Sequence, residues 1–114
     1  MKPKAEVLDT QRLDELDEKI SDWGLARGII KNSTAKDQYL KLVSEVGELG
    51  DAIAKEDEDG LVDAIGDVFV CLLMIAECEG HTVEYCVGKA WNQIKDRTGY
   101  LTPDGVFVKD DDQQ

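Results

Sequence analysis

The sequence predicts an all-α protein: four helices in a helical bundle completed by oligomerisation, then a short extended C-terminal segment. Two observations predict this fold class. Apolar residues recur at three- and four-residue steps along four separate segments, which is the period of an amphipathic helix. The chain has 114 residues, 42% of them hydrophobic, so its own core is modest. We therefore expect one helical domain over residues 1–114, with residues 1–8 and 109–114 frayed.

The first two predicted helices are separated by a short connection. In "TQRLDELDEKISDWGLARGI" the apolar period predicts a helix from about Leu13 that ends near Gly28. The segment "IKNST" predicts a connection, with Ser33 or Thr34 as the N-cap of a second helix that extends to about Lys55. The apolar positions of that helix are Leu40, Val43, Val46 or Gly47, and Ile53.

A charged turn, "KEDEDG", separates the second helix from a third that begins near Leu61 and ends near Glu79. Gly80 is a good C-terminal stop, and Thr82 is a good N-cap for a fourth helix in "VEYCVGKAWNQIKDR". A Pro-Asp-Gly turn at residues 103–105 then precedes the short extended segment.

Composition limits the partners. The chain has 25 acidic and 13 basic side chains, a formal net charge of −12, which argues against binding to nucleic acid or to an anionic membrane surface. The negative charge still allows a phosphorylated small molecule to bind if a metal ion reverses the local charge. The three cysteines have no metal-type spacing, and no signal-like or membrane-spanning apolar run is present, so we expect a cytoplasmic location.

Two pairs of acidic residues stand beside the apolar positions of neighbouring helices. Glu45 and Glu48 are three residues apart, and Asp63 and Asp67 are four apart, so each pair shares one helix face. A short turn joins the two helices, so they should pack antiparallel and bring the four carboxylates together. Hard oxygen ligands in this number suit Mg²⁺ or Mn²⁺. The alternative is a solvated face, since acidic pairs are common in so acidic a chain.

Three glycines lie inside the same two helices. Gly47, Gly50 and Gly66 each cost about 1 kcal/mol of helix stability relative to alanine. Two explanations stay open at this point: a close helix–helix approach, or room for a ligand beside the acids.

The segments "KLVSEVGELGDAI" and "LVDAIGDVFV" resemble the MazG-like all-α nucleoside triphosphate pyrophosphohydrolases. Members of that family carry a Glu-x-x-Glu pair on one helix and, on the next, a second acidic pair that ends in Gly-Asp. Here Glu45 and Glu48 match the first pair, and Gly66 and Asp67 match the end of the second. The downstream "GKAWNQIKDRTGY" is similar to the family's basic segment, and the resemblance covers roughly residues 20 to 108.

The resemblance implies a homodimeric or homotetrameric enzyme that hydrolyses a (d)NTP to a (d)NMP and pyrophosphate with Mg²⁺. It places Glu45, Glu48 and Asp67 at the metal with Asp63 in support, and Glu48 is also expected to orient or deprotonate the attacking water. The expected substrate-binding residues are Lys89, Asn92, Lys95, Arg97 and Tyr100.

The chain departs from the family pattern at two positions. Ser44 precedes Glu45 where the family usually has a second adjacent acid, and Ala64 stands three residues before Asp67 where it usually has Glu. These departures keep open a non-catalytic acidic helical interaction module that has lost the activity. An acidic mimic of DNA is a third hypothesis. Of the three hypotheses, only the enzyme predicts that the protein responds to millimolar Mg²⁺.

Overall fold

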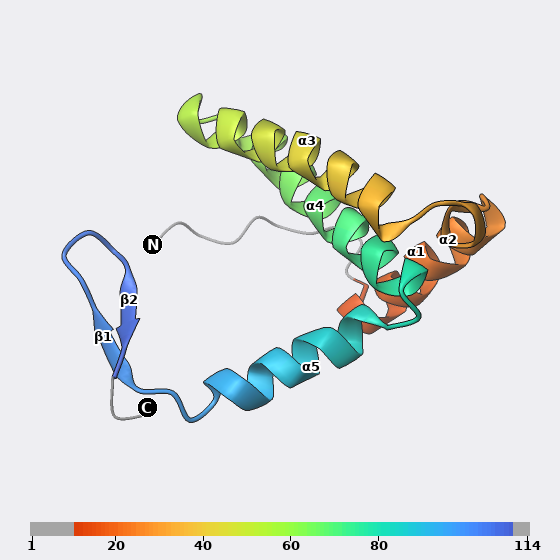
Figure 1. Ribbon diagram of the computed structural model, residues 1–114. Helices are drawn as coiled ribbons and strands as arrows, with labels where there is room; N and C mark the ends of the chain where they lie inside the picture. The colour runs from red at the N-terminus through yellow and green to blue at the C-terminus, as the bar shows by residue number, and fades with distance from the viewer. Residues whose placement is uncertain (1–10, 111–114) are drawn as a thin grey trace. The chain divides into compact units, whose positions relative to one another are not determined.

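The structure is a computed structural model that describes residues 11–110. The helices in this range are α1 (Leu13–Ala26), α2 (Ile29–Asn32), α3 (Ala35–Ala54), α4 (Glu58–Cys78) and α5 (Val83–Ile94) (Figure 1). They are followed by the antiparallel strands β1 (Gly99–Leu101) and β2 (Phe107–Lys109). The all-α fold class is therefore confirmed.

The described residues form two compact units that divide between Val83 and Glu84. The first unit contains α1 to α4, and the second contains nearly all of α5 and the two strands. Of the segments predicted to be frayed, residues 1–8 and 111–114 lie outside the described residues. Lys109, which was predicted to be frayed, pairs with Gly99 in the sheet.

The connection after α1 contains a helix that the sequence analysis did not predict. The first helix ends at Ala26, and Gly28 adopts a left-handed conformation with φ of 77°. The carbonyl oxygen of Gly28 then accepts hydrogen bonds from the Asn32 backbone N–H at 2.9 Å and from its side-chain amide at 3.0 Å. These bonds close one helical turn, α2, within the segment predicted to be a plain connection.

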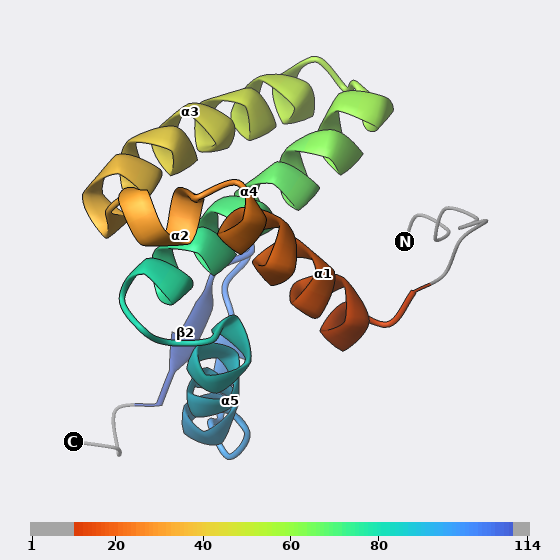
Figure 2. The same ribbon diagram turned by 90° about the vertical axis from the view of Figure 1, so that its right-hand side faces the viewer.

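Side-chain caps define the α3–α4 hairpin. Thr34 Oγ1 accepts a hydrogen bond from the Asp37 N–H at 3.1 Å, which confirms Thr34 as the N-cap of α3. Asp57 Oδ1 accepts one from the Gly60 N–H at 3.0 Å, so α4 begins at Glu58, earlier than the predicted start near Leu61. The two helices lie side by side and antiparallel in both views (Figures 1 and 2).

The core of the first unit is centred on α4. Leu73 and Met74 are its largest fully buried side chains. Gly24 of α1 lies against Met74: a Cβ at this glycine would stand 2.5 Å from the Met74 methyl carbon, so the absence of a side chain permits this approach. Ser21 Oγ also donates a hydrogen bond to Glu77 Oε1 at 2.5 Å, which joins α1 to α4.

The second unit contains the predicted extended segment as a β-hairpin. Its register pairs Gly99 with Lys109 and Leu101 with Phe107. The Gly105 N–H donates to the Thr102 carbonyl oxygen at 2.9 Å, and Gly105 has φ of 84°, so the predicted Pro-Asp-Gly turn joins the strands.

The cysteines are free thiols: Cys71 is buried, Cys78 is half-buried and Cys86 is exposed. Among residues 11–110, no helix combines the length and the apolar character needed to cross a membrane.

Candidate metal centre

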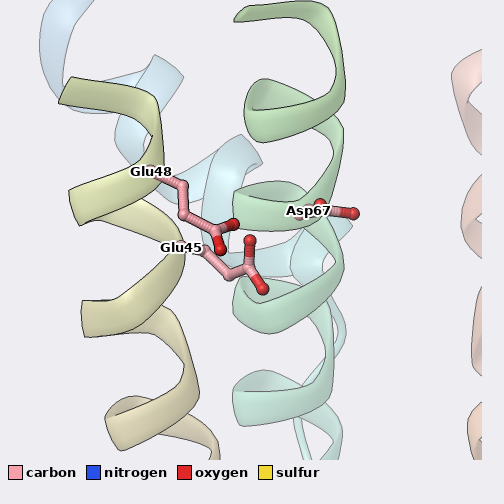
Figure 3. Close-up of side chains that lie close together, drawn as sticks. All are labelled: Glu45, Glu48 and Asp67. Carbon is pink, nitrogen blue, oxygen red and sulfur yellow. The ribbon is translucent and has the colours of Figure 1, made fainter. Parts of the chain in front are cut away.

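Three of the four predicted acidic ligands converge between α3 and α4. Glu45, Glu48 and Asp67 each offer one carboxylate oxygen, and these oxygens all lie within 4.8 Å of one another. Figure 3 shows Glu45 and Glu48 extending from α3 toward α4, the helix that carries Asp67. Their three-residue spacing puts the two glutamates on one face of α3.

Glu45 is the buried member of this group. The residue is 7% exposed, and its Oε1 lies 3.3 Å from Lys41 Nζ in a charged hydrogen bond. This bond to Glu45 raises the pKa of Lys41. The other oxygen, Oε2, is buried and has no hydrogen-bond partner among residues 11–110. A buried carboxylate oxygen without a partner costs free energy, and a cation between the three carboxylates would satisfy it.

The donor set therefore fits a hard divalent cation. Glu45, Glu48 and Asp67 supply only carboxylate oxygens, the ligands that Mg²⁺ and Mn²⁺ prefer.

The titration of neighbouring groups reflects the same concentration of negative charge. Hydrogen bonding to Glu45, and then the negative charge of Glu45, raise the pKa of Glu48. Burial, followed by the charge of Glu45, raises the pKa of the Cys71 thiol, which lies on α4. A further negative charge beside Glu45 is thus unfavourable when no cation balances it.

A cavity of about 360 Å³ adjoins the carboxylates at the turn end of the hairpin. Asp63 lies outside the group of three, but it lines this cavity together with Glu48 and Asp67. The neighbouring residue, Ala64, is only 3% exposed. Asp63 is therefore placed beside the candidate centre, and its predicted supporting role stays a prediction.

A second cavity, of about 520 Å³, lies between α1 and α4. Its walls are mostly apolar, with Leu16 and Ile20 on α1 and Phe69 on α4. Asp63 and Asp67 line this cavity as well as the first, so an apolar hollow adjoins the acidic one.

The residues predicted to bind substrate lie in the second unit. Lys89 and Asn92 are on α5, Lys95 and Arg97 follow its end, and Tyr100 is on β1. All five side chains are exposed. Their role in binding a nucleotide stays a prediction.

The helix glycines beside the acids do not mark a contact between helices. A Cβ built at Gly47, Gly50 or Gly66 would have no atom within 4 Å. The explanation by close helix approach within the described chain is therefore wrong, and the surface above each glycine is open.

Lys41 was missed by the sequence analysis. It lies four residues before Glu45 on α3, and this spacing puts the two side chains on the same face. A systematic search for opposite charges at four-residue spacing would have found the pair.

We expect Glu48→Gln to stabilise the metal-free protein at about pH 7 more than at about pH 4. The pKa of Glu48 in the folded protein is raised above its ordinary value of 4.5. The Glu48 side chain therefore contributes to the stability of the folded protein when the pH is below 4.5. The contribution is lost as the pH rises through the raised pKa, and glutamine does not undergo this loss.

The measurement is the Tm of both proteins in a chelator at the two pH values. Asp51→Asn is the matched control, since Asp51 lines the cavity outside the group of three carboxylates. If Glu48→Gln raised the Tm by the same amount at both pH values, the raised pKa of Glu48 would be contradicted.

Comparison with known proteins places this geometry in a family. The model of the MazG nucleotide pyrophosphohydrolase domain matches residues 33–101, which include α3, α4 and α5. The chain is also 37% identical over 65 residues to a protein of Haemophilus phage HP1 (strain HP1c1) named "Uncharacterized 18.2 kDa protein in rep-hol intergenic region". That match covers 57% of this chain and 40% of the phage protein. No solved structure matches the chain significantly.

Because the family model covers more than half of the chain and includes all three converging carboxylates, the chain belongs to the MazG nucleotide pyrophosphohydrolase domain family.

Proposed function

We propose that the chain is a Mg²⁺-dependent nucleoside triphosphate pyrophosphohydrolase that converts a (d)NTP to a (d)NMP and pyrophosphate in the cytoplasm. One observation carries the proposal. Three carboxylates from α3 and α4 converge, and one of their oxygens is buried without a partner, in a chain of the MazG family. Mn²⁺ is the alternative metal, because its ligand preference is similar.

In this proposal Glu45, Glu48 and Asp67 hold the metal and Asp63 supports it from the adjoining cavity. Bound Mg²⁺ would offset the charge of the phosphates and polarise the phosphoryl oxygens. The carboxylates alone would repel a triphosphate, so binding of metal and binding of substrate should depend on each other.

Glu48 is the proposed catalytic residue. It orients a water molecule and takes a proton from it as the water oxygen bonds to the α-phosphorus. The bond between the α-phosphorus and the oxygen that bridges to the β-phosphorus breaks, and pyrophosphate leaves with the electron pair of that bond.

The second unit is proposed to supply the contacts to substrate. Lys89, Lys95 and Arg97 provide cations for the phosphates, and Asn92 provides an amide for phosphate or sugar. Tyr100, which is 60% exposed, is available to contact the base or sugar. The apolar cavity between α1 and α4 adjoins Asp67 and offers a second surface for the nucleoside.

Pyrophosphate release from a panel of canonical and modified (d)NTPs, in millimolar Mg²⁺ and in chelator, tests the proposal. We expect a (d)NMP and pyrophosphate as products, formed only with Mg²⁺ or Mn²⁺. Formation of a diphosphate and phosphate would overturn the proposed bond cleavage. No turnover of any triphosphate with either metal would favour the non-catalytic interaction module, to which Ser44 and Ala64 point.

A further inference from the structure

The acidic cavity, of about 360 Å³, extends from the candidate metal centre to the turn between α3 and α4. Its lining residues on α3 follow one another at steps of three, one and three, so they share one face of that helix. They are Glu48, Asp51, Ala52 and Lys55. On α4 the lining extends from Gly60 to Asp67. The cavity therefore has the metal centre at one end and Lys55 near the other.

Lys55 is the basic residue in the lining of this cavity, where the other charged residues are acidic. No hydrogen bond or ion pair joins its side chain to any residue between 11 and 110. Asp51 lies four residues before it, a spacing at which opposite charges often pair on a helix, yet the two do not pair. Lys41, in contrast, is already bound to Glu45. The Lys55 ammonium is therefore available to an anionic ligand.

The end of α3 holds the backbone of Lys55 in place. Lys55 is the C-cap residue of the helix. The Asp57 N–H donates to the Ala52 carbonyl oxygen at 3.0 Å, across the end of the helix. Between them, Glu56 has φ of 54°, a left-handed conformation that residues other than glycine rarely adopt. This closed turn fixes where the Lys55 side chain leaves the backbone, at the turn end of the acidic cavity.

The two cavities beside the metal centre suit different parts of a nucleotide. The apolar cavity between α1 and α4 shares Asp63 and Asp67 with the acidic cavity, and no basic residue lines it. Phosphate groups carry several negative charges, and their transfer from water to an apolar surface costs free energy. The acidic cavity supplies polar walls and the Lys55 cation. The β- and γ-phosphates are therefore favoured on the turn side of the metal centre rather than on the α1 side.

We infer that Lys55 binds the pyrophosphate part of a nucleoside triphosphate, whose β- and γ-phosphates point along the acidic cavity toward the α3–α4 turn. The inference rests on the proposed function, in which water attacks the α-phosphorus at the metal centre. Lys55 lies seven residues after Glu48, about 10 Å along the axis of α3. Its ammonium donates hydrogen bonds to phosphate oxygens.

Lys55 also has a role in the cleavage step. Pyrophosphate gains negative charge as it leaves with the electron pair of the broken bond. A fixed cation at that position stabilises the developing charge, and it offsets the acidic side chains that line the cavity. Mg²⁺ at the metal centre and Lys55 near the turn would thus hold the two ends of the triphosphate.

A lysine at the end of a helix also interacts favourably with the helix dipole. This purely structural role would change the stability of the protein but not its affinity for pyrophosphate. The two roles of Lys55 are therefore separated by measuring stability and pyrophosphate binding on the same variants.

Isothermal titration of the full chain with pyrophosphate, in millimolar Mg²⁺, tests the inference. We expect Lys55→Gln to raise the Kd of pyrophosphate by about 10-fold, the order expected for the loss of one hydrogen bond to a charged group. Lys55→Arg keeps the positive charge and should restore most of the affinity. The titration requires no turnover, so it tests Lys55 separately from the proposed function.

Lys36→Gln is the matched control. It removes the same charge from the same helix, but Lys36 lies 19 positions before Lys55, about 28 Å along the axis of α3. We expect this variant to bind pyrophosphate as the wild type does. Circular dichroism and the Tm without ligand report whether each variant is folded.

A wild type that hydrolyses triphosphates, with a Lys55→Gln variant that binds pyrophosphate as tightly as Lys36→Gln, would overturn the inference and leave the proposed function standing. A wild type that does not bind pyrophosphate in millimolar Mg²⁺ would also overturn the inference. If the wild type binds pyrophosphate through Lys55 but hydrolyses no triphosphate, the proposed function fails while the binding site for pyrophosphate is supported.

Product inhibition tests the direction of the triphosphate. Lys55→Gln should weaken inhibition by pyrophosphate about 10-fold and leave the Ki of the nucleoside monophosphate unchanged, since that product has no β- or γ-phosphate. Equal weakening of inhibition by both products would overturn the direction assigned here.

Discussion

Replacing Glu45 with glutamine is expected to lower kcat/KM for a nucleoside triphosphate by more than about 100-fold, because changes merely adjacent to metal ligands already cost about 10–100-fold. Glu45 is the buried member of the carboxylate group, and its Oε2 has no hydrogen-bond partner among residues 11–110. Glutamine keeps the shape but removes the negative charge that would hold the cation. Stabilisation of the protein by Mg²⁺ should be lost together with activity.

The measurement pairs steady-state pyrophosphate release with the rise in Tm on adding Mg²⁺. Asp51→Asn is the control, since it removes one charge from the lining of the same cavity but outside the group of three. It should retain most of the Mg²⁺ stabilisation. A Glu45→Gln variant that still gains stability from Mg²⁺ and turns over at the wild-type rate would remove Glu45 from the metal centre.

The glutamate pair was predictable because its geometry is local. Residues three apart on a helix share a face whatever the helix packs against, so Glu45 and Glu48 had to lie together once α3 formed. The Thr34 cap was predictable for the same reason, since the donor is the N–H of Asp37, three residues away.

The relation between α3 and α4 was less predictable because it depends on how each helix is rotated. The apolar positions chosen on α3 included Leu40, Val43, Val46 and Ile53, yet all four are at least half exposed. The contact side instead carries Glu45 and Ala52. Periodicity identifies an apolar face of a helix, but it does not say whether that face meets the next helix or a different molecule.

The rotation of the helix also decides which of Asp63 and Asp67 joins the group of carboxylates. Sequence spacing puts both on one side of α4, within one turn of each other. Which of them reaches Glu45 and Glu48 depends on the burial of Ala64 and Cys71, which sets the rotation of α4. Asp63 and Asp67 both line the two cavities, but only Asp67 joins the group of three.

Replacing Leu73 with alanine is expected to lower the free energy of unfolding by about 2–5 kcal/mol, the range measured when buried leucines are truncated. Leu73 is fully buried in α4. Few other large side chains among residues 11–110 are equally buried, so little neighbouring core is available to refill the cavity. Because a domain of this size loses several degrees of Tm per kcal/mol, the Tm should fall by roughly 10 °C or more.

Chemical and thermal unfolding followed by circular dichroism measure this loss, with all proteins at one concentration because any self-association would make Tm depend on concentration. Leu25→Ala is the control: it makes the same truncation in α1, where Leu25 is 60% exposed, and should cost about 0.5 kcal/mol or less. Equal losses for the two variants would mean that the stability of the chain does not depend on the core around α4. Its main source would then be contacts made on assembly, and the unfolding transition would depend on protein concentration.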